Sequence, residues 1–351
     1  MKILYGVPSE GMGHATRSKV VIQYLLDCKH DVRIVTSDRA FTFLQKHFGD
    51  RVISIEGFHL AYKNAEVSII KTALATLKNA PKQLIKNFST YQSILADFSP
   101  EFVISDFESF THFYAKTKRL PLISIDNMQI LNRAQLDISI PKEEKSNYLL
   151  AKNIVKAKVI GANHYFITSF FNPTLKDSKT SYVHPIIRNE IVKEKPSIKN
   201  HIVVYQTSTS QSNLVNILQQ LPNEQFIVYG FNKEENCGNV QLKMFSEDEF
   251  IKNFASAKAV LANGGFSFIS EAVYLGKPIY TVPIKNQFEQ FVNAAYIQKL
   301  NYGRHFNEFS SDTIKAFLYD LPLFNKSIKE YKHDDNKALF QGIDKIIKSV
   351  S

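Results

Sequence analysis

The sequence predicts an α/β protein made of two doubly wound parallel sheets. Short apolar runs alternate with helical patterns in both halves of the chain. With 351 residues the chain is too long for one ordinary core and fits two domains of common size. A polar stretch with three prolines, residues 173–199, separates the halves and predicts a linker.

The first half begins with an expected strand at residues 2–7, followed by a helical pattern from Ala15 to Leu26. Further strands are expected at 32–36, 52–55, 102–106 and 122–126, with the last one between 159 and 168. Residues 58–96 break the alternation and predict a long, mostly helical insert. Together these elements predict a first domain over residues 1–172.

The second half repeats the same architecture without an internal repeat of fixed period. Its strands are expected at 202–205, 226–229, 240–242, 259–262 and 279–282. A helix is expected at 247–256, just before the fourth of these strands. The second domain therefore covers residues 200–327, and a helical, basic tail follows at 328–351.

Composition limits the class of protein. No segment approaches the ~20 apolar residues of a spanning helix, and the N-terminus lacks the apolar region of a signal peptide. Cys28 and Cys237 are far apart, without metal-like spacing, so neither a disulfide scaffold nor zinc is expected. These features favour the cytoplasm. The formal charge of +10 favours an acidic partner, namely anionic lipid, nucleic acid or a phosphorylated substrate, although solubility alone would also explain it.

A glycine turn after the strand at 259–262 predicts an anion site. Gly264 and Gly265 let the backbone bend sharply and leave room for a ligand. Ser267 then stands where a helix would begin, so free N–H groups and the positive end of the helix dipole face the space above the turn. A diphosphate is the anion that this geometry favours.

Three polar residues after this turn suit a sugar nucleotide. Glu271 lies one helical turn further on, and its carboxylate can accept two hydrogen bonds from a ribose diol. Glu289 and Gln290 supply an acceptor and an amide that suit sugar hydroxyls.

The ordered set from Asn263 to Glu271, continued by Gly276, Pro278, Pro283 and residues 289–294, resembles the donor-site signature of GT-B-fold glycosyltransferases. The similarity extends to plant-type UDP-sugar transferases and to the peptidoglycan transferase that makes lipid II. It is closer still to bacterial and archaeal transferases of the same fold. The resemblance implies two Rossmann-like domains facing across a cleft, with the acceptor on the first and the donor on the second. It also implies that the last helix crosses back to the first domain.

The plant-type signature differs in part from this chain. Gly265 and Glu271 are kept, whereas Asn263 stands in place of a His. Three further positions differ in type, and they are Phe266 for Trp, Ser267 for Asn and Phe268 for Ser. The resemblance thus implies that the ribose contact carries over, and it places the stretch from Gly264 to Phe268 at the donor. A helix N-terminus that only packs is the alternative.

The first glycine loop does not fit a nicotinamide site. Gly11 and Gly13 start the pattern, but Thr16 stands where a third glycine belongs, and Asp31 precedes the second strand rather than ending it. The loop resembles instead the Gly-x-Gly-His turn of the lipid II transferase, and His14 matches the catalytic histidine of the plant-type enzymes. Gly13 is included in the expected donor site.

The chemistry of inverting transfer explains a histidine at this place. The acceptor hydroxyl must lose its proton as it attacks the anomeric carbon, and an imidazole can take that proton. Asp106 ends a neighbouring strand and is the expected partner of His14, with Glu108 in reserve. Capping or a structural turn is the alternative for His14, and capping of the next helix is the alternative for Asp106.

The resemblance adds four further donor contacts. Thr207 and Ser208 lie in a loop that approaches the diphosphate in relatives, although they also suit a helix cap before Leu214. Phe245 lies where relatives hold the nucleobase, or it belongs to the core. Arg188 matches an arginine of the lipid II enzyme and could neutralise diphosphate, or it lies on the surface.

No Asp-x-Asp motif occurs, so we expect no obligate metal and no cofactor beyond the nucleotide sugar, with uridine as the base that the resemblance implies. The insert at 58–92 carries five lysines against one acid, Glu66, among apolar residues. It predicts peripheral docking on the inner face of an anionic membrane, where a lipid-linked acceptor could enter, or a helix that packs on its own domain. A soluble anionic acceptor is also compatible.

The sequence therefore predicts an inverting, metal-independent glycosyltransferase that acts on a lipid or saccharide of the cell envelope. A nonhydrolysing UDP-sugar 2-epimerase of the same fold is the first alternative. A basic nucleic-acid-binding protein is the second, and it is disfavoured because no helix-turn-helix, zinc spacing or aromatic RNA signature is present.

Overall fold

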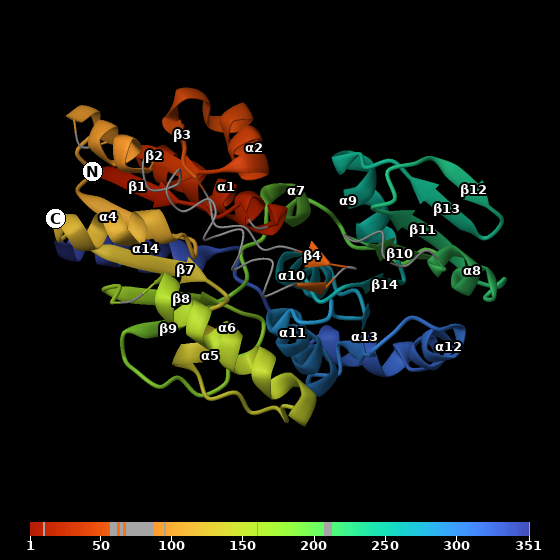
Figure 1. The fold of residues 1–351 in the computed structure, drawn as a ribbon. Coiled ribbons are helices and arrows are strands. Elements are labelled where there is room, and N and C mark those ends of the chain that lie inside the picture. Colours follow the sequence, from red (N-terminus) through yellow and green to blue (C-terminus); the bar gives the residue numbers. More distant parts are fainter. Residues whose placement is uncertain are drawn as a thin grey trace. The chain divides into compact units, whose positions relative to one another are not determined.

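The computed structural model describes all residues except 10, 57–61, 64–65, 68–86, 95, 160, 207–212 and 351. The chain divides into two compact units (Figure 1). Unit 1 comprises Met1–Tyr62, Val67–Ile186 and Asp334–Ser351. Unit 2 comprises Lys63–Glu66 and Ile187–His333.

Unit 1 is built on a seven-stranded sheet with the order β3-β2-β1-β6-β7-β8-β9, in which every described neighbour pair is parallel. The strands are β1 (Lys2–Gly6), β2 (Asp31–Thr36), β3 (Val52–Ser54), β6 (Phe102–Ser105), β7 (Leu122–Asp126), β8 (His164–Thr168) and β9 (Thr180–Val183). The strands β6 and β7 are buried along their whole length, which explains why most of their residues are apolar.

The helices of unit 1 cover this sheet. They are α1 (Met12–Asp27), α2 (Asp38–Phe48), α4 (Ser109–Lys118), α5 (Ile130–Arg133), α6 (Lys145–Lys158) and α14 (Lys337–Val350), with helical residues also at 87–94. Short 3-10 turns lie at Gly49–Arg51 and Lys142–Glu144. One apolar core joins side chains of β1 and β2 to those of α1, α2 and α14.

The C-terminal helix α14 belongs to unit 1. Leu339, Ile343 and Ile347 are buried in the same core as the strands. The ring of Phe340 stacks on Tyr24 of α1 with centroids 3.9 Å apart. The tail that was expected at 328–351 thus packs on the first sheet from Asp334 onward, while α13 (Leu321–Ile328) stays in unit 2.

Unit 2 is built on a second seven-stranded sheet with the order β12-β13-β11-β10-β14-β15-β16. Its strands are β10 (His201–Tyr205), β11 (Gln225–Tyr229), β12 (Glu235–Cys237), β13 (Val240–Lys243), β14 (Ala259–Ala262), β15 (Ile279–Thr281) and β16 (Gly303–His305). All pairs are parallel except β12 with β13. Besides α13, the helices are α7 (Asn189–Val192), α8 (Leu214–Gln219), α9 (Glu247–Ser256), α10 (Phe266–Tyr274), α11 (Phe288–Lys299) and α12 (Ser311–Tyr319).

The order of strands decides which loops meet. In unit 1, β1 pairs with β6, so the loop after Gly6 lies beside the loop after Ser105. In unit 2, β14 lies between β10 and β15, so the turn after Ala262 starts between the carboxyl ends of those two strands. These are the carboxyl edges at which parallel sheets bind their ligands.

Two expectations about the chain's organisation differ from the structure. The expected linker at 173–199 contains β9, which is the edge strand of the first sheet, and the units change at Ile186 and Ile187. The expected helical insert contains a two-stranded ribbon of β4 (Tyr62–Lys63) and β5 (Glu66–Val67), and most of the rest of it lies outside the described residues.

Candidate active site

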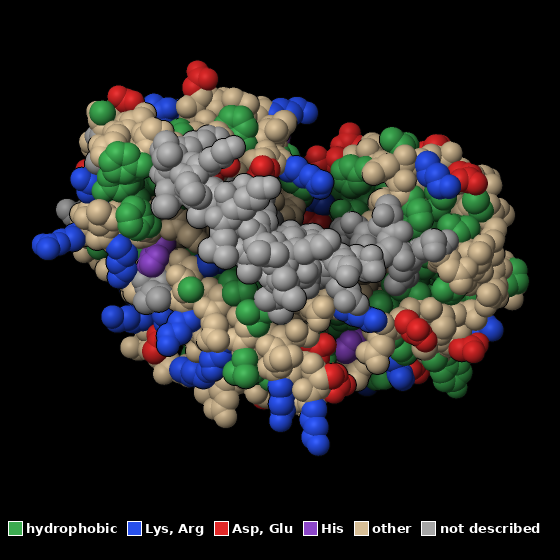
Figure 2. All heavy atoms as spheres, in the orientation of Figure 1, with side chains coloured by type: hydrophobic (Ala, Val, Ile, Leu, Met, Phe, Trp, Pro, Cys, Tyr) green, Lys and Arg blue, Asp and Glu red, His purple; other side chains and the backbone are tan. Residues whose placement is uncertain are grey.

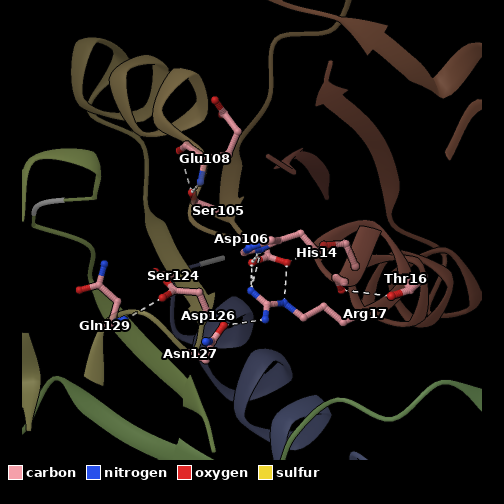
Figure 3. A network of polar contacts seen from close by, with 12 residues as sticks. His14, Thr16, Arg17, Ser105, Asp106, Glu108, Ser124, Asp126, Asn127 and Gln129 are labelled. Carbon is pink, nitrogen blue, oxygen red and sulfur yellow. Dashed lines mark hydrogen bonds and ion pairs between the residues drawn. The ribbon is translucent and has the colours of Figure 1, made fainter. Parts of the chain in front are cut away.

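His14 and Asp106 meet at the carboxyl edge of the first sheet (Figure 3). His14 lies in the first turn of α1, and Asp106 directly follows β6. The Asp106 backbone N–H donates to the carbonyl of Gly6 at 2.9 Å, which extends the pairing of β1 and β6 by one residue. As a result, Nδ1 of His14 lies 2.9 Å from Oδ1 of Asp106. The structure therefore brings the two expected catalytic residues together.

A third residue, Arg17, completes this cluster and was missed in the sequence. Its Nε donates to Oδ2 of Asp106 at 2.9 Å and its Nη2 donates to Oδ1 at 2.5 Å. Its Nη1 donates to Oδ1 of Asn127 at 2.8 Å, just after β7. The available signal was spacing, because Arg17 lies three residues after His14 and hence on the same helix face.

The carboxylate of Asp106 is buried and fully occupied. Ser18 adds a hydrogen bond from Oγ to Oδ2 at 2.9 Å, so each carboxylate oxygen has two partners. Burial by itself raises the pKa of Asp106, but the charges of Arg17 and His14 outweigh burial and hold this pKa well below its usual range. These two cations therefore favour the anionic form of Asp106.

Glu108, the reserve partner for His14, has a different role. Its carboxylate caps α4 by accepting from the backbone N–H groups of Phe110 and Thr111, both at 2.7 Å. Burial raises the pKa of Glu108, and these hydrogen bonds oppose the rise. Phe107, between the two acids, adopts a left-handed φ of 58°, which turns the chain between Asp106 and the cap.

In unit 2, the glycine turn after β14 is held by side chains of α11. Oε1 of Gln290 accepts hydrogen bonds from the backbone N–H groups of Gly264 and Ile284, each at 3.0 Å. Nδ2 of Asn293 donates to the carbonyl of Gly264 at 2.9 Å. Gln290, expected at the sugar, thus stabilises the turn with its carbonyl oxygen.

The helix α10 begins at Phe266 with Gly265 as its N-cap, and no side chain caps it. Phe266 is buried, whereas Ser267 is only partly buried. The ring of Phe268 stacks between Tyr205 and Phe254, with centroid distances of 5.1 and 4.7 Å. A methyl group added at Gly265 would meet nothing within 4 Å, so open space adjoins the N-terminus of the helix.

Glu271 is held by Arg188. Nε of Arg188 donates to Oε1 of Glu271 at 2.7 Å, and Nη2 donates to Oε2 at 3.0 Å. The remaining Nη1 donates to Glu247 at 2.7 Å. Burial raises the pKa of Glu271, and the charge of Arg188 works against that rise. Because all three guanidinium nitrogens contact carboxylates, the geometry favours an orienting role for Arg188 over the expected contact to diphosphate.

The remaining residues that were expected at the donor belong to neither the glycine turn nor the pair of Arg188 and Glu271. Phe245 is 52% exposed and lies tilted against the ring of Phe250, so it is not a core residue. Glu289 is partly buried in the first turn of α11, and Gly13 lies in the first turn of α1. Thr207 and Ser208 lie outside the described residues. Within the described part of the chain, no three His, Cys, Asp or Glu side chains gather as metal ligands would.

Comparison with known proteins gives the family. Residues 1–322 match the sequence profile of glycosyl transferase family 1. The chain belongs to this family. It is therefore a glycosyltransferase, and members of the family take their sugar from nucleotide-sugar donors.

Relatives of this glycosyltransferase occur in archaea. An uncharacterized glycosyltransferase of Methanosarcina mazei is 26% identical over an alignment 342 positions long that covers 87% of this chain and 85% of the relative. A second one, from Methanosarcina acetivorans, is 24% identical over 330 residues with the same coverage.

Solved structures share the fold. The calicheamicin glycosyltransferase CalG4 superposes with a TM-score of 0.69 at 15% identity and covers 99% of this chain and 98% of its own. An Arabidopsis thaliana glycosyltransferase, solved with quercetin, superposes with a TM-score of 0.67 at 13% identity and covers 99% of both chains. The expected GT-B architecture, with its two Rossmann-like sheets, is confirmed.

Proposed function

We propose that this glycosyltransferase moves a sugar from a uridine diphosphate donor to a hydroxyl group, with inversion and without an obligate metal. His14 takes the proton of the acceptor hydroxyl, and the acceptor oxygen bonds to the anomeric carbon. The bond from that carbon to the diphosphate oxygen breaks, and the nucleoside diphosphate leaves with the electron pair. One displacement inverts the anomeric centre. Asp106 stabilises the imidazolium that forms.

One observation supports this mechanism above the others. Nδ1 of His14 lies against Asp106, and within the described residues Nε2 of His14 makes no hydrogen bond. Because Nδ1 is engaged and Nε2 is not, the ring can present a lone pair to a substrate once Nδ1 carries the proton. An epimerase that acts on the donor alone has no acceptor hydroxyl for such a base to deprotonate.

We place the donor in unit 2. The uncapped start of α10 offers backbone N–H groups and a dipole to the diphosphate, beside the open space at Gly265. Glu271, oriented by Arg188, accepts from the ribose hydroxyls with its remaining lone pairs. Phe245 offers an exposed aromatic face to the base, and Glu289 an acceptor to the sugar.

A thermal-shift screen tests the donor assignment, since a ligand that binds only the folded state raises apparent stability. UDP and UDP-sugars should raise the melting temperature more than the diphosphates of other bases, and Glu271→Ala should abolish the rise. Transfer should continue in excess EDTA. Conversion of a UDP-sugar to its 2-epimer without acceptor would favour the rival enzyme.

We further propose that the acceptor is carried by, or lies next to, an anionic bilayer. Unit 1 has 26 Lys and Arg against 18 Asp and Glu, whereas unit 2 has 17 against 15, so nearly all of the net charge lies on unit 1. No described helix is long and apolar enough to cross a membrane. Docking on the surface is the mode of membrane contact that fits this charge.

The residues suited to such docking lie on α4, on helical residues 87–94 and on α6. Phe88 and Phe113 are 64% and 61% exposed, and α6 carries four lysines and no acid. Figure 2 shows hydrophobic side chains gathered over α4, with Lys and Arg side chains below them. Much of the insert at 58–92 that was expected to dock lies outside the described residues.

Vesicle sedimentation tests this surface. The protein should sediment with vesicles containing phosphatidylglycerol and not with pure phosphatidylcholine, and added salt should release it. Phe113→Ala should weaken sedimentation. Tyr319→Ala, which removes an 86% exposed ring from unit 2, is the matched control. If Phe113→Ala and Tyr319→Ala lower sedimentation equally, α4 is not part of the docking surface.

A further inference from the structure

Nδ1 of His14 has two competing neighbours. It lies 2.9 Å from Oδ1 of Asp106, which only accepts hydrogen bonds, and 2.8 Å from Nη2 of Arg17, which only donates them. A neutral imidazole nitrogen is either a donor or an acceptor. Only one of the two contacts can therefore be a hydrogen bond at a time.

The two alternatives differ at the opposite ring nitrogen. When Nδ1 carries the proton and donates to Asp106, Nε2 has a free lone pair and can act as a base. When Nδ1 accepts from Arg17, the proton sits on Nε2, and His14 cannot take a proton there from a hydroxyl. The choice of partner therefore switches His14 between a competent and an idle tautomer.

Arg17 cannot simply move aside. Its side chain is 5% exposed, and three of its nitrogen contacts go to Asp106 and Asn127. The other ionisable groups around the cluster are Glu108 after β6, Asp126 at the end of β7 and Tyr5 on β1. Burial raises the pKa of all three, whereas Arg17 and Asp106 are the charged groups in direct contact with the His14 ring.

The charge balance points the same way. With Arg17 and Asp106 paired, the three side chains are neutral as a group before His14 takes a proton and carry one positive charge afterwards. Without Arg17 they would change from one negative charge to neutral. A positive charge beside the ring makes proton uptake less favourable.

We propose that Arg17 is a positioning residue that fixes Asp106 and competes with it for Nδ1 of His14, and thereby sets how readily the imidazole takes and releases a proton. The inference rests on the proposed role of His14 as the base in sugar transfer. Asn127 acts through Arg17 by holding its Nη1.

Two substitutions separate the charge from the geometry. In Arg17→Gln the charge is lost, so the acidic limb of the pH–rate profile should move to higher pH by about one unit. In Arg17→Lys the positive charge stays, but the two parallel hydrogen bonds from the guanidinium group to Asp106 are lost. The acidic limb of the pH–rate profile should therefore stay near its wild-type position, while kcat falls about tenfold or more. Arg133 is a partly buried arginine elsewhere in unit 1 that pairs with Asp177, and Arg133→Lys should change neither the acidic limb nor kcat.

The ring nitrogens themselves give a readout that does not depend on activity. NMR of protein labelled with ¹⁵N-histidine reports which ring nitrogen carries the proton, and the His14 signals are those that disappear in His14→Gln. In the wild-type protein, part of His14 should be in the Nε2–H form. Arg17→Gln should shift it to the Nδ1–H form. Should the Gln variant fail to fold, Arg17→Met carries the test, because a thioether side chain offers no N–H to Nδ1 and the Nδ1–H form must still gain population.

An unchanged tautomer together with an unmoved pH limb would overturn the proposal. A tautomer shift in Arg17→Gln with full transfer activity in His14→Ala would instead contradict the proposed function, and it would leave the competition at Nδ1 intact. The two failures are thus distinguishable.

Discussion

Arg188 joins both carboxylate oxygens of Glu271, from Nε at 2.7 Å and from Nη2 at 3.0 Å. Such a fork fixes the plane of the carboxylate as well as its position. Arg188 opens α7 as its N-cap residue, and Glu271 lies in the middle of α10, so the pair links two segments of unit 2. We infer that the pair holds Glu271 ready for the ribose before the donor arrives.

Arg188→Lys should therefore lower the affinity for UDP about tenfold, because an ammonium group keeps the charge but cannot orient both oxygens. Isothermal titration calorimetry measures the change. Glu247→Gln is the control, since Glu247 is 45% exposed and contacts only the third nitrogen of Arg188, and it should bind UDP within about twofold of wild type. If Arg188→Lys binds UDP as tightly as the wild-type protein, the pairing of Arg188 with Glu271 does not contribute to donor binding.

The two glycines of the turn should respond differently to alanine. At Gly264 a new methyl would lie 2.5–2.8 Å from the backbone and Cβ of Gln290, so Gly264→Ala should destabilise the fold by about 3 kcal/mol. At Gly265, where φ is −64° and nothing lies within 4 Å, Gly265→Ala should leave unfolding within ~1 kcal/mol of wild type.

The same Gly265→Ala variant should nevertheless bind UDP more weakly, because its methyl projects into the space proposed for the diphosphate. Urea unfolding and calorimetry together check both statements. If Gly265→Ala binds UDP as tightly as wild type, the diphosphate lies elsewhere.

Lys277 should make stability depend on alkaline pH. Its side chain is buried, Nζ donates to the carbonyl of Ser197 at 2.6 Å, and burial lowers the pKa of Lys277 to about 8 from 10.5. Between these values the unfolded chain binds more protons than the folded one, so this residue makes stability rise with pH from 8 to 10.5. Below pH 8 Lys277 is charged in both the folded and the unfolded chain, so burial of its charge lowers the free energy of unfolding by the full amount.

Lys277→Met should consequently stabilise the protein at pH 7 by about 2 kcal/mol, after allowance for the lost hydrogen bond. The gain should shrink as the pH rises toward 10. Unfolding in urea at pH 7 and pH 9.5, compared between the variant and wild type, measures both. A variant that is less stable at each pH would show that the ammonium group contributes more than its burial costs.

The sequence predicts the interior strands and the edge strand β3 well, but it misses the edge strands β9, β12 and β16. Strands such as β6 and β14 are buried throughout, so their residues form apolar runs that can be recognised. The edge strands β9, β12 and β16 bury only some of their side chains, so their sequences are as polar as those of loops. This is why β9 was assigned to the linker, between Pro173 and Pro185.

The site shows a similar limit. Asp106 directly follows β6 and His14 lies in the first turn of the helix after β1, and the parallel pairing of β1 and β6 brings them together. Arg17 reads as a surface residue of a helix, because arginine is rarely buried without a partner, and its partner is 89 residues away. Gln290 has amide groups that suit a sugar or a backbone equally, so only the structure distinguishes the two roles.

The most direct test of the account compares wild type with His14→Ala under saturating donor. The dissociation constant of UDP should remain within about twofold, because His14 belongs to unit 1, whereas the residues proposed to hold the diphosphate and the ribose belong to unit 2. The rate of sugar transfer should fall 10²- to 10⁴-fold, the range expected for loss of a general base. Transfer at the wild-type rate in His14→Ala would contradict the assignment of His14 as the base.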